Sequence, residues 1–500
     1  KMYTTVARKC QLLILACTWP VLVAVLTFDC HSTLHNKSAC VADARCAWCF
    51  HVDDLPQQFC AAKGEKLGPF ASCDPMVLDQ AVRNFFEHWA EKHRRSYVSS
   101  DERSTRLAYF KDNLEQLTAA SLQSPHAMYA PDEFADWSQE ELRGLRGGAA
   151  LTSASARAVH FSTVEVAAAV AAGPLDWVSR GAVTKPTSQG RCATCAYFAG
   201  VAAVEGAWAL AGHPLVKLSE QEEIDCGNNG EYALNSIIRN GIARAVDAPL
   251  ANHSDPTIKG CRGITNCSDA FKHTFAHIDS VEASSHEEEQ ILALLQKGPL
   301  VASIDAGPYN GYGGGILNCS ASGPYHHVDH ANAVVGYGVE PPPVKCATQP
   351  VNHSFTTYCG SEWTGRQGGF WPEWKPFAAK TLEECCNRCG DIVGSPPEDP
   401  KWSSPFCGAA IFKEGTCYMR ATSADGHSLS GMPKPNANAT TCIPFGRTPV
   451  PQVPIWYWKL KNSWGAGFGE GGYARLLYGN TCLRGVARPV ITSIIASAVE

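Results

Sequence analysis

The distribution of cysteine constrains this chain more than any other feature. The 500 residues contain 23 cysteines, gathered in clusters with long cysteine-free stretches between them. Six lie from Cys30 to Cys73, and eight lie from Cys346 to Cys442. A segment as short as the first cannot bury a large core, so disulfide bonds must hold it. We therefore expect an oxidising compartment and several folded units, about three from length alone.

The first 29 residues have the pattern of a secretory signal peptide. Arg8 and Lys9 precede an apolar run from Leu12 to Phe28, and a basic flank followed by such a run directs export. A membrane anchor formed by residues 12–28 is the alternative, because the run is close to the shortest spanning helix. Sequons fit the same route; they are Asn36, Asn252, Asn266, Asn318, Asn352 and Asn438. The expected location is the secretory pathway, either extracellular or in a lysosome- or vacuole-like compartment.

The stretch SQGRCATCAYFAG (Ser188–Gly200) places Cys192 and Cys195 three residues apart. The alanine-rich apolar run that begins at Cys195 predicts one buried helix. A cysteine at a helix N-terminus lies at the positive end of the dipole, which favours the thiolate. The pair could otherwise be a redox dithiol, half of a zinc site or a structural disulfide. A redox pair would need a strand just before it, where Pro186 and Gly190 stand.

Three separated motifs, in a fixed order, resemble those of papain-like cysteine proteases. The first is the stretch around Cys195 together with LSEQEEIDC (Leu218–Cys226). The second is VDHANAVVGYG (Val328–Gly338), and the third is YWKLKNSWGAGFGEGGYARL (Tyr457–Leu476). The resemblance implies an α+β fold with a helical lobe, a β-barrel-like lobe and a substrate cleft between them. The peptidase domain is expected at 173–340 and 454–500.

The resemblance also implies the roles of individual residues. Cys195 is expected to be the nucleophile, with Cys192 in a disulfide, and His330, 135 residues after Cys195, to be its partner base. Asn462 is expected to orient the imidazole, while Trp464 shields that hydrogen bond. The side-chain amide of Gln189 is expected to donate to the oxyanion. The β-branched residues after His330 predict that it begins a strand.

The cysteine count agrees with a thiol at Cys195. Cys10 and Cys17 lie in the expected signal peptide, and their removal leaves an odd number of cysteines. An odd number implies one thiol outside disulfides.

The family's substrate-binding turn is shortened here to CGNNGEY (Cys226–Tyr232). Gly230 and Tyr232 are expected to line the cleft together with Trp464. Cys226 lacks its usual close neighbour in this turn, so its expected partner is Cys192 or Cys261. The family's tryptophan after the nucleophile is alanine in this chain.

Residues 76–146 resemble the inhibitory propeptide of the same family. One helical stripe consists of Glu102, Arg106, Phe110, Asn113 and Leu117. APDEFADWSQEEL (Ala130–Leu142) resembles the second propeptide motif through Phe134 and Asp136. We expect this segment to be an intramolecular inhibitor. Residues 147–172, rich in Ala, Ser and Thr, are expected to be an activation linker with little reason to pack.

Two further segments resemble small disulfide-rich modules. Residues 30–75, through RCAWCF, resemble a PSI module, which implies an extracellular interaction or spacer role; an unrelated disulfide knot is the alternative. Residues 341–453 separate His330 from Asn462 by far more than the family's usual spacing. In this insert TLEECCNRCG, CGAAIF and GTCYMR resemble a PAN/apple module, which implies a protein or carbohydrate ligand. A disulfide-held loop without a partner is the alternative.

No cofactor, metal or nucleic acid is expected. GFGEGG (Gly467–Gly472) matches a dinucleotide fingerprint but lacks its strand-to-helix context. A metal bound by the histidines at 326, 327 and 330 with Asp329 would occupy the base. The net charge is −6 and there is no basic stripe, which gives no electrostatic case for nucleic acid.

The sequence therefore predicts a secreted or lysosome-like cysteine endopeptidase, made as a propeptide-inhibited zymogen. Its polypeptide substrates are hydrolysed by a Cys195 thiolate and His330 imidazolium pair through an acyl-enzyme. An exopeptidase is disfavoured because no loop that would block one end of the cleft is evident. The alternative from another class is an inactive secreted binding protein on a protease-like fold. The presence of Cys195, His330, Asn462 and Gln189 together argues against it.

Overall fold

The computed structural model describes residues 40, 42, 44–51, 54–63, 71–124, 126–146, 156–227, 233–253, 261, 267, 273–318, 328–342, 355–363, 377–394, 407–421, 433–444, 453–479 and 482–491. The expected signal peptide or anchor lies outside these residues. None of the helices within them has both the length and the hydropathy needed to cross a bilayer.

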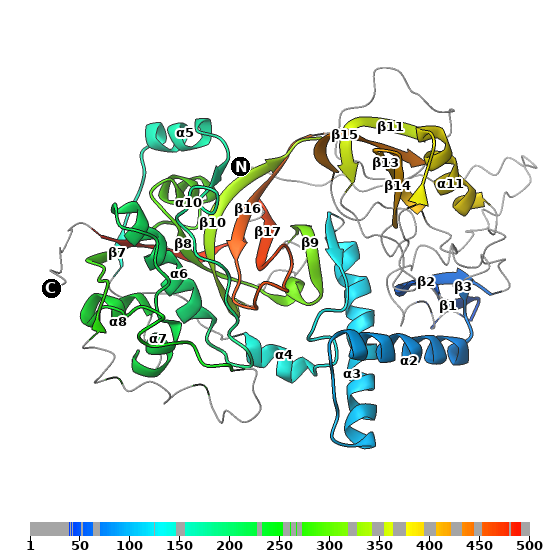
Figure 1. The fold of residues 1–500 in the computed structure, drawn as a ribbon, viewed down its shortest axis with the longest axis horizontal. Helices are drawn as coiled ribbons and strands as arrows, with labels where there is room; N and C mark the ends of the chain where they lie inside the picture. Colours follow the sequence, from blue (N-terminus) through cyan, green and yellow to red (C-terminus); the bar gives the residue numbers. More distant parts are fainter. Residues whose placement is uncertain are drawn as a thin grey trace, which may run out of the picture.

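A helical lobe forms one side of the peptidase domain (Figure 1). Its helices are α6 (Cys195–Leu210), α7 (Glu220–Cys226) and α8 (Ala233–Asn240). Most of α6 is buried, as its run of alanine and valine predicts. The hydroxyl of Ser219 caps α7 by accepting the Glu222 N–H at 3.0 Å. No side chain caps the first turn of α6. The Tyr197 N–H donates to the carbonyl oxygen of Thr194 at 3.0 Å, whereas the N–H groups of Cys195 and Ala196 have no acceptor within the helix.

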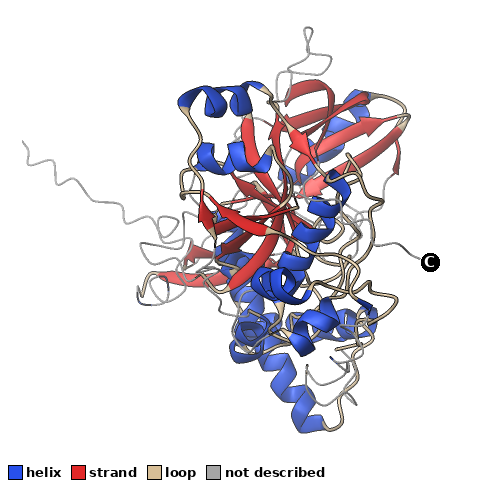
Figure 2. Cartoon of the chain, turned by 90° about the vertical axis from the view of Figure 1, so that its left-hand side faces the viewer, coloured by secondary structure: helices blue, strands red, loops and turns tan. Residues whose placement is uncertain are grey.

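A sheet of ten strands forms the second lobe, and Figure 2 shows its strands in the middle of the molecule with helices above and below them. Its order is β4 (Ala127–Tyr129), β9 (Tyr312–Leu317), β17 (Tyr473–Leu477), β16 (Ile455–Lys461), β10 (His330–Glu340), β8 (Leu300–Ile304), β18 (Arg484–Val490), β7 (Ser280–Ala283) and β5 (Arg157–Ala158), with β6 (Leu175–Asp176) paired to β10. Helix α10 (Glu288–Leu295) is almost wholly buried in this lobe. The two lobes confirm the predicted α+β class.

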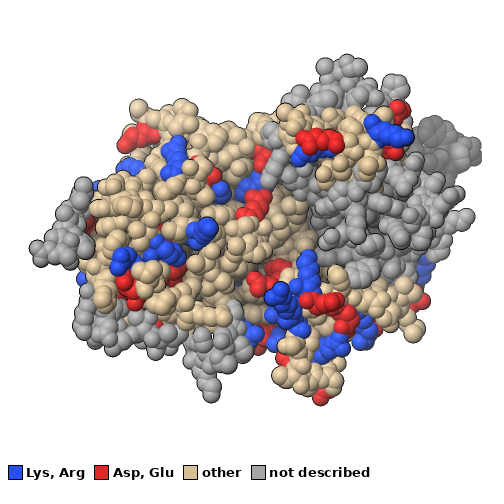
Figure 3. All heavy atoms as spheres, viewed as in Figure 1, with Lys and Arg blue, Asp and Glu red and all other residues tan. Residues whose placement is uncertain are grey.

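The propeptide region consists of α2 (Pro75–Lys92), α3 (Ser100–Gln123) and α4 (Gln139–Leu145). An aromatic cluster joins the first two helices, because the ring of Phe110 lies 5.3 Å from that of Phe86 and 5.1 Å from that of Trp89. Acidic and basic side chains alternate on the outer surface of these helices (Figure 3). Strand β4 then adds the region to the edge of the peptidase sheet at β9.

Residues 156–172 pack on the peptidase domain, so the prediction that 147–172 has little reason to pack is wrong for this part. Strand β5 pairs with β7, and α5 (Thr163–Ala171) follows. The buried Phe161 donates its N–H to Gln290 Oε1 at 2.7 Å, and its carbonyl accepts from Gln290 Nε2 at 3.0 Å. The composition of this segment did not reveal Phe161 as an anchor, because its partner is 129 residues away.

The described residues also contain two small sheets outside the peptidase and propeptide regions. The N-terminal one contains β1 (Cys46–His51), β2 (Asp54–Ala62) and β3 (Ala71–Ser72). The sheet of the insert runs β11 (Phe355–Trp363), β15 (Pro433–Pro444), β13 (Cys407–Lys413), β14 (Thr416–Ala421) and β12 (Phe377–Ala378), beside α11 (Leu382–Gly394). Disulfides Cys385–Cys417 and Cys386–Cys442 join α11 to two of these strands.

The insert leaves the peptidase domain at the end of β10 that is remote from His330. Strands β10 and β16 are antiparallel, and their register pairs Glu340 with Ile455 and Ala333 with Lys461. The whole insert therefore lies beyond the Glu340–Ile455 pair. The same register returns the chain to Asn462 beside the start of β10, which explains how 132 residues can separate His330 and Asn462 in sequence.

Candidate active site

Three elements bring the predicted catalytic residues together. Helix α6 begins at Cys195 and strand β10 begins at His330, as predicted. Asn462 directly follows the last residue of β16. All three side chains are buried, with at most 2% of their surface exposed.

Both nitrogens of the His330 ring have defined surroundings. Nε2 lies 2.8 Å from Oδ1 of Asn462. Nδ1 is buried and has no hydrogen-bond partner among the described residues. Burial alone would lower the pKa of His330, but the charge of Cys195, with Asn462 and Asp329, raises it above its ordinary value of 6.5. The surroundings of His330 therefore favour its protonated form.

Of the cysteines whose side chains are described, Cys195 is the one that forms no disulfide. Cys192 is bonded to Cys261, so its expected structural role is confirmed. The predicted partner of Cys226 is wrong, because Cys226 is bonded to Cys267. The shortened turn cannot supply the usual neighbour, and Cys261 and Cys267 bond to Cys192 and Cys226 instead.

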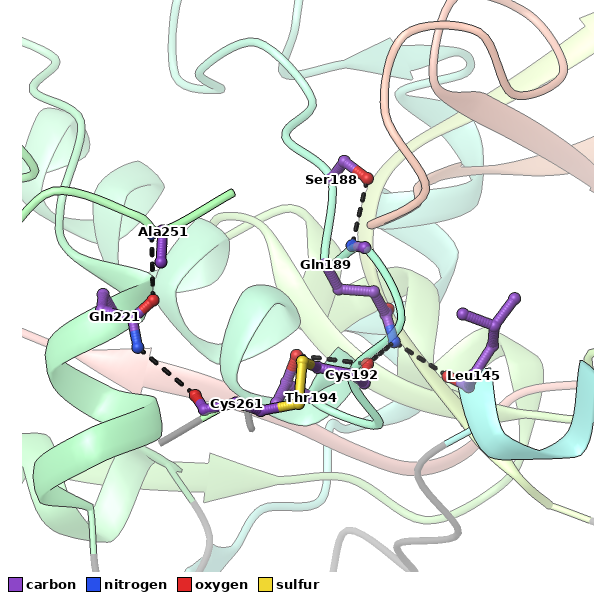
Figure 4. The surroundings of a disulfide bond; sticks show 9 residues. Leu145, Ser188, Gln189, Cys192, Thr194, Gln221, Ala251 and Cys261 are labelled. Atoms are coloured by element: carbon purple, nitrogen blue, oxygen red, sulfur yellow. Dashed lines mark hydrogen bonds between the residues drawn. A yellow bond between two sulfur atoms is a disulfide. The ribbon is translucent and has the colours of Figure 1, made fainter. Parts of the chain in front are cut away.

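The side chain of Gln189 lies beside residues 190–194, here called the nucleophile loop because they precede Cys195. It points toward the propeptide (Figure 4). Its Nε2 donates to the carbonyl oxygen of Leu145 at 2.8 Å and to that of Cys192 at 2.5 Å. Its Oε1 accepts from the hydroxyl of Ser463 at 2.5 Å. The amide that was predicted to donate to an oxyanion is thus occupied by a backbone carbonyl at the end of propeptide helix α4.

Trp464 lies beside the imidazole of His330. Its ring lies 5.2 Å from the imidazole, and 2% of the residue is exposed. Phe134 of the propeptide contacts the same indole edge-on at 5.7 Å. The other predicted cleft residues, Gly230 and Tyr232, lie outside the described residues.

The possible metal cluster of the sequence analysis consists of the histidines at 326, 327 and 330 with Asp329. In this cluster Asp329 is bound by other protein groups. Asp329 accepts the Ala306 N–H at 2.9 Å and pairs with Arg146 of the propeptide at 3.3 Å. Residues 326 and 327 lie outside the described part of the chain. Within that part, no three His, Cys, Asp or Glu side chains are arranged to hold a metal ion.

Four residues that sequence reasoning missed complete the site: Arg146, Tyr309, Asn332 and Ser463. Ser463 follows Asn462 in the motif Tyr457–Leu476, so its position next to a predicted catalytic residue could have suggested that it contacts the site. Asn332 is the only amide side chain in an otherwise largely apolar β10, where it is 1% exposed. A lone buried amide needs partners, and that signal was available in the sequence.

Comparisons with known proteins agree with this geometry. Residues 172–362 and 434–494, about half of the chain, match the papain family cysteine protease profile. Residues 86–142 match the cathepsin propeptide inhibitor domain. The chain therefore belongs to the papain family of cysteine proteases and carries the inhibitor domain found in its propeptides.

Curated relatives match about half of the chain. A cysteine proteinase of Trypanosoma brucei brucei is 30% identical over 270 residues, which cover 52% of this chain and 58% of the relative. The viral cathepsin of Lymantria dispar multicapsid nuclear polyhedrosis virus is 31% identical over 278 residues, covering 52% of this chain and 74% of the relative. The chain spans less than two thirds of the first of these.

Among solved structures, a recombinant stem bromelain precursor superposes with a TM-score of 0.50 at 19% identity, covering 82% of this chain and 99% of the other. At this identity the likeness concerns the fold, which is the papain-like one predicted from the three motifs.

Proposed function

We propose that this protein is a cysteine endopeptidase that is made as a propeptide-inhibited zymogen. One observation carries the proposal: the thiol at the N-terminus of α6 adjoins an imidazole whose Nε2 is held by Asn462 at 2.8 Å. A binding protein built on this fold has no physical need for a buried imidazole with a raised pKa beside a thiol.

In the proposed reaction the Cys195 thiolate attacks a peptide carbonyl carbon and forms a tetrahedral oxyanion. The backbone N–H of Cys195 and Nε2 of Gln189 donate to that oxygen. His330 gives its Nδ1 proton to the leaving amine as the C–N bond breaks, which leaves a thioester on Cys195. His330 then takes a proton from water, and the resulting hydroxide releases the carboxylic acid and restores the thiolate–imidazolium pair.

The test is digestion of denatured casein by the full chain before and after acid maturation, with Cys195→Ala as the control. Internal fragments should appear after maturation and depend on Cys195. Stepwise removal of terminal dipeptides would indicate an exopeptidase instead. A matured protein that cuts no peptide bond, or a Cys195→Ala variant that cuts equally well, would contradict the proposal.

Gln189→Ala should lower kcat about 100-fold in the matured protein, because one oxyanion donor is lost. Steady-state kinetics on a peptide substrate would measure it. Gln290→Ala is the matched control, since that buried glutamine bonds to Phe161 and should leave kcat unchanged. A Gln189→Ala enzyme within about twofold of wild type would remove Gln189 from the proposed mechanism.

The propeptide contacts support an inhibitory role for residues 76–146. The Leu145 carbonyl occupies the Gln189 amide, and a substrate oxyanion needs that same donor. Arg146 bonds to Asp329 and, at 2.9 Å, to Asn310. The propeptide therefore spans the nucleophile loop and the edge of β10 at once, and substrate cannot reach Gln189 until it leaves.

An ion pair inside the propeptide predicts a pH dependence of this inhibition. Arg106 donates to both carboxylate oxygens of Glu141, at 2.6 and 2.9 Å. Burial alone would raise the pKa of Glu141, but hydrogen bonds from Arg106 and Ser138 lower it below 4.5. A lowered pKa means that the pair stabilises the propeptide above pH 4.5 and ceases to do so as pH falls through the lowered value.

Glu141→Gln should therefore speed autoactivation at pH 6, and the advantage over wild type should disappear as the pH falls through the lowered pKa of Glu141. The ratio of the two activation rates is the quantity to measure, because it cancels the pH dependence of the cleavage itself. Glu140→Gln removes the same charge from an exposed neighbour and should leave the ratio near one. A Glu141→Gln ratio that does not change with pH would contradict the assignment.

The two small modules are proposed to bind partners outside the peptidase cleft. The helix-and-sheet insert, with disulfides that join α11 to β14 and β15, supports a PAN/apple-type module at 341–453 with a protein or carbohydrate ligand. Strands β1 to β3 support a PSI-like module at 30–75. The disulfides support folding in the secretory pathway, with residues 1–29 as signal peptide or anchor, 147–172 as the activation region and 173–340 with 454–500 as the peptidase domain.

A further inference from the structure

A continuous chain of buried hydrogen bonds runs behind the imidazole of His330. The hydroxyl of Tyr309 donates to Oδ1 of Asn332 at 2.9 Å. Nδ2 of Asn332 donates to Oδ1 of Asn462 at 2.9 Å, and that same oxygen lies 2.8 Å from Nε2 of His330. None of these four residues is more than 2% exposed. The chain comes from three elements, namely η3 (Gly307–Tyr309), β10 and the end of β16.

The orientation of each amide in this chain follows from one backbone carbonyl. The carbonyl oxygen of Lys461 can only accept, and it lies 3.3 Å from Nδ2 of Asn332. This contact requires the NH₂ group of Asn332 on that side, and its second N–H then points at Asn462. The atom of Asn462 that receives it must be the oxygen.

Asn462 has no comparable support of its own. Its Nδ2 is buried without a hydrogen-bond partner among the described residues, so its own NH₂ group does not hold the carboxamide in place. The donation from Asn332 is what keeps Oδ1 toward His330. Because Oδ1 is an acceptor, His330 must then carry a hydrogen on Nε2, and Nδ1 is the nitrogen left to exchange a proton with Cys195.

Tyr309 holds the other end of the chain and also contacts the ring that it helps to orient. Its side chain is 0% exposed, and its ring meets the imidazole edge-on at 6.0 Å and Trp464 at 5.8 Å. Rotation of the Asn332 amide would break the bonds to Tyr309, Lys461 and Asn462 together. A buried amide that is satisfied on both sides is therefore fixed in a single orientation.

We propose that Asn332, supported by Tyr309, is a positioning residue that holds the Asn462 carboxamide, and through it the His330 tautomer, for the reaction. This inference rests on the proposed peptidase function and adds two buried residues that act through Asn462. The titratable groups that face His330 are Cys195 from α6, Asp329 from the edge of its own strand and Tyr309 from η3. Asn332→Val removes none of these groups, although the Tyr309 hydroxyl loses its acceptor.

The experiment compares Asn332→Val and Tyr309→Phe with wild type in the matured protein. Asn332→Val should lower kcat about tenfold with little change in KM, because the loss falls on orientation and not on substrate binding. Without the donation to Oδ1 the imidazolium is less well stabilised, so the alkaline limb of kcat/KM should move to lower pH. Tyr309→Phe, which keeps the ring, should show a smaller change in the same direction.

Two controls separate positioning from a general loss of structure. Tyr312→Phe removes a hydroxyl from another buried tyrosine, which donates to the Gly315 carbonyl at 2.7 Å; it should leave the pH profile in place. In an Asn462→Ala background, Asn332→Val should have no further effect on kcat, because nothing remains to be oriented. Additive losses, or an unshifted alkaline limb in Asn332→Val, would overturn the proposal.

A readout that needs no turnover separates this inference from the proposed function. In the full chain with Cys195→Ala, nitrogen chemical shifts of His330 at neutral pH should report hydrogen on Nε2, and Asn332→Val should give a tautomer mixture. If the matured wild type cuts no peptide but this difference is present, the peptidase function fails and the positioning stands. The same tautomer in both proteins would overturn the positioning.

Discussion

Replacing His330 by alanine should reduce kcat/KM for peptide hydrolysis at least about 1,000-fold, because the thiolate loses its counter-ion and the leaving amine loses its acid. The imidazole is wholly buried and its pKa is raised by Cys195, so neither solvent nor a neighbouring group can take its place. The residual rate would come from the oxyanion donors and substrate binding alone.

The variant cannot process itself, so it should be matured by immobilised wild-type protein that is then removed. Initial rates on a fluorogenic peptide give kcat/KM. His286→Ala, an exposed histidine of the same domain, should retain full activity. A His330→Ala enzyme that keeps more than about a tenth of wild-type activity would assign the base to another residue.

Phe110→Ala in the propeptide should make the unprocessed chain active at neutral pH. Phe110 is 0% exposed and lies within 5.4 Å of three aromatic rings, so its truncation leaves a cavity at the junction of α2 and α3. Such a loss costs about 3–5 kcal/mol. Because the propeptide must be folded to hold Leu145 against Gln189, we expect at least about a 100-fold increase in initial activity before any processing.

Initial rates of the full-length chain, taken while a gel still shows it intact, measure this effect. Val98→Ala is the control for loss of an apolar side chain, because Val98 is 95% exposed. The intact chain of this variant should remain inactive. If Phe110→Ala lowers the unfolding midpoint of the propeptide yet leaves the intact chain inactive, inhibition does not depend on the folding of these two helices.

Local sequence signals predicted the parts of the site that local structure decides. The helix that begins at Cys195 and the strand that begins at His330 follow from apolar runs and turn residues in their own segments. The approach of Asn462 to His330 depends on the antiparallel register of β10 and β16, which spacing alone could not reveal across so long an insert. The contact between Asn462 and His330 was predicted only because the order of the three motifs resembles that of papain-like proteases.

The remaining features depend on partners that are distant in sequence. The docking of residues 156–172 rests on Phe161 and the side chain of Gln290, and no periodicity links these two positions. The pairing of Cys226 with Cys267 is one of several that the spacing allowed. The sequence shows Asn332 as a polar residue in a largely apolar strand. Its hydrogen-bond partners, Tyr309 and Lys461, could be identified only from the structure.

Alkylation of the acid-matured, unreduced protein tests the thiolate–imidazolium pair most directly. Iodoacetamide at about pH 5.5 reacts quickly only with a thiol that is already ionised, and mass spectrometry locates the adduct. We expect a single adduct on Cys195 that is lost in His330→Ala. A Cys195 that stays unlabelled in the wild type, or is labelled equally without His330, would contradict the proposed nucleophile–base pair.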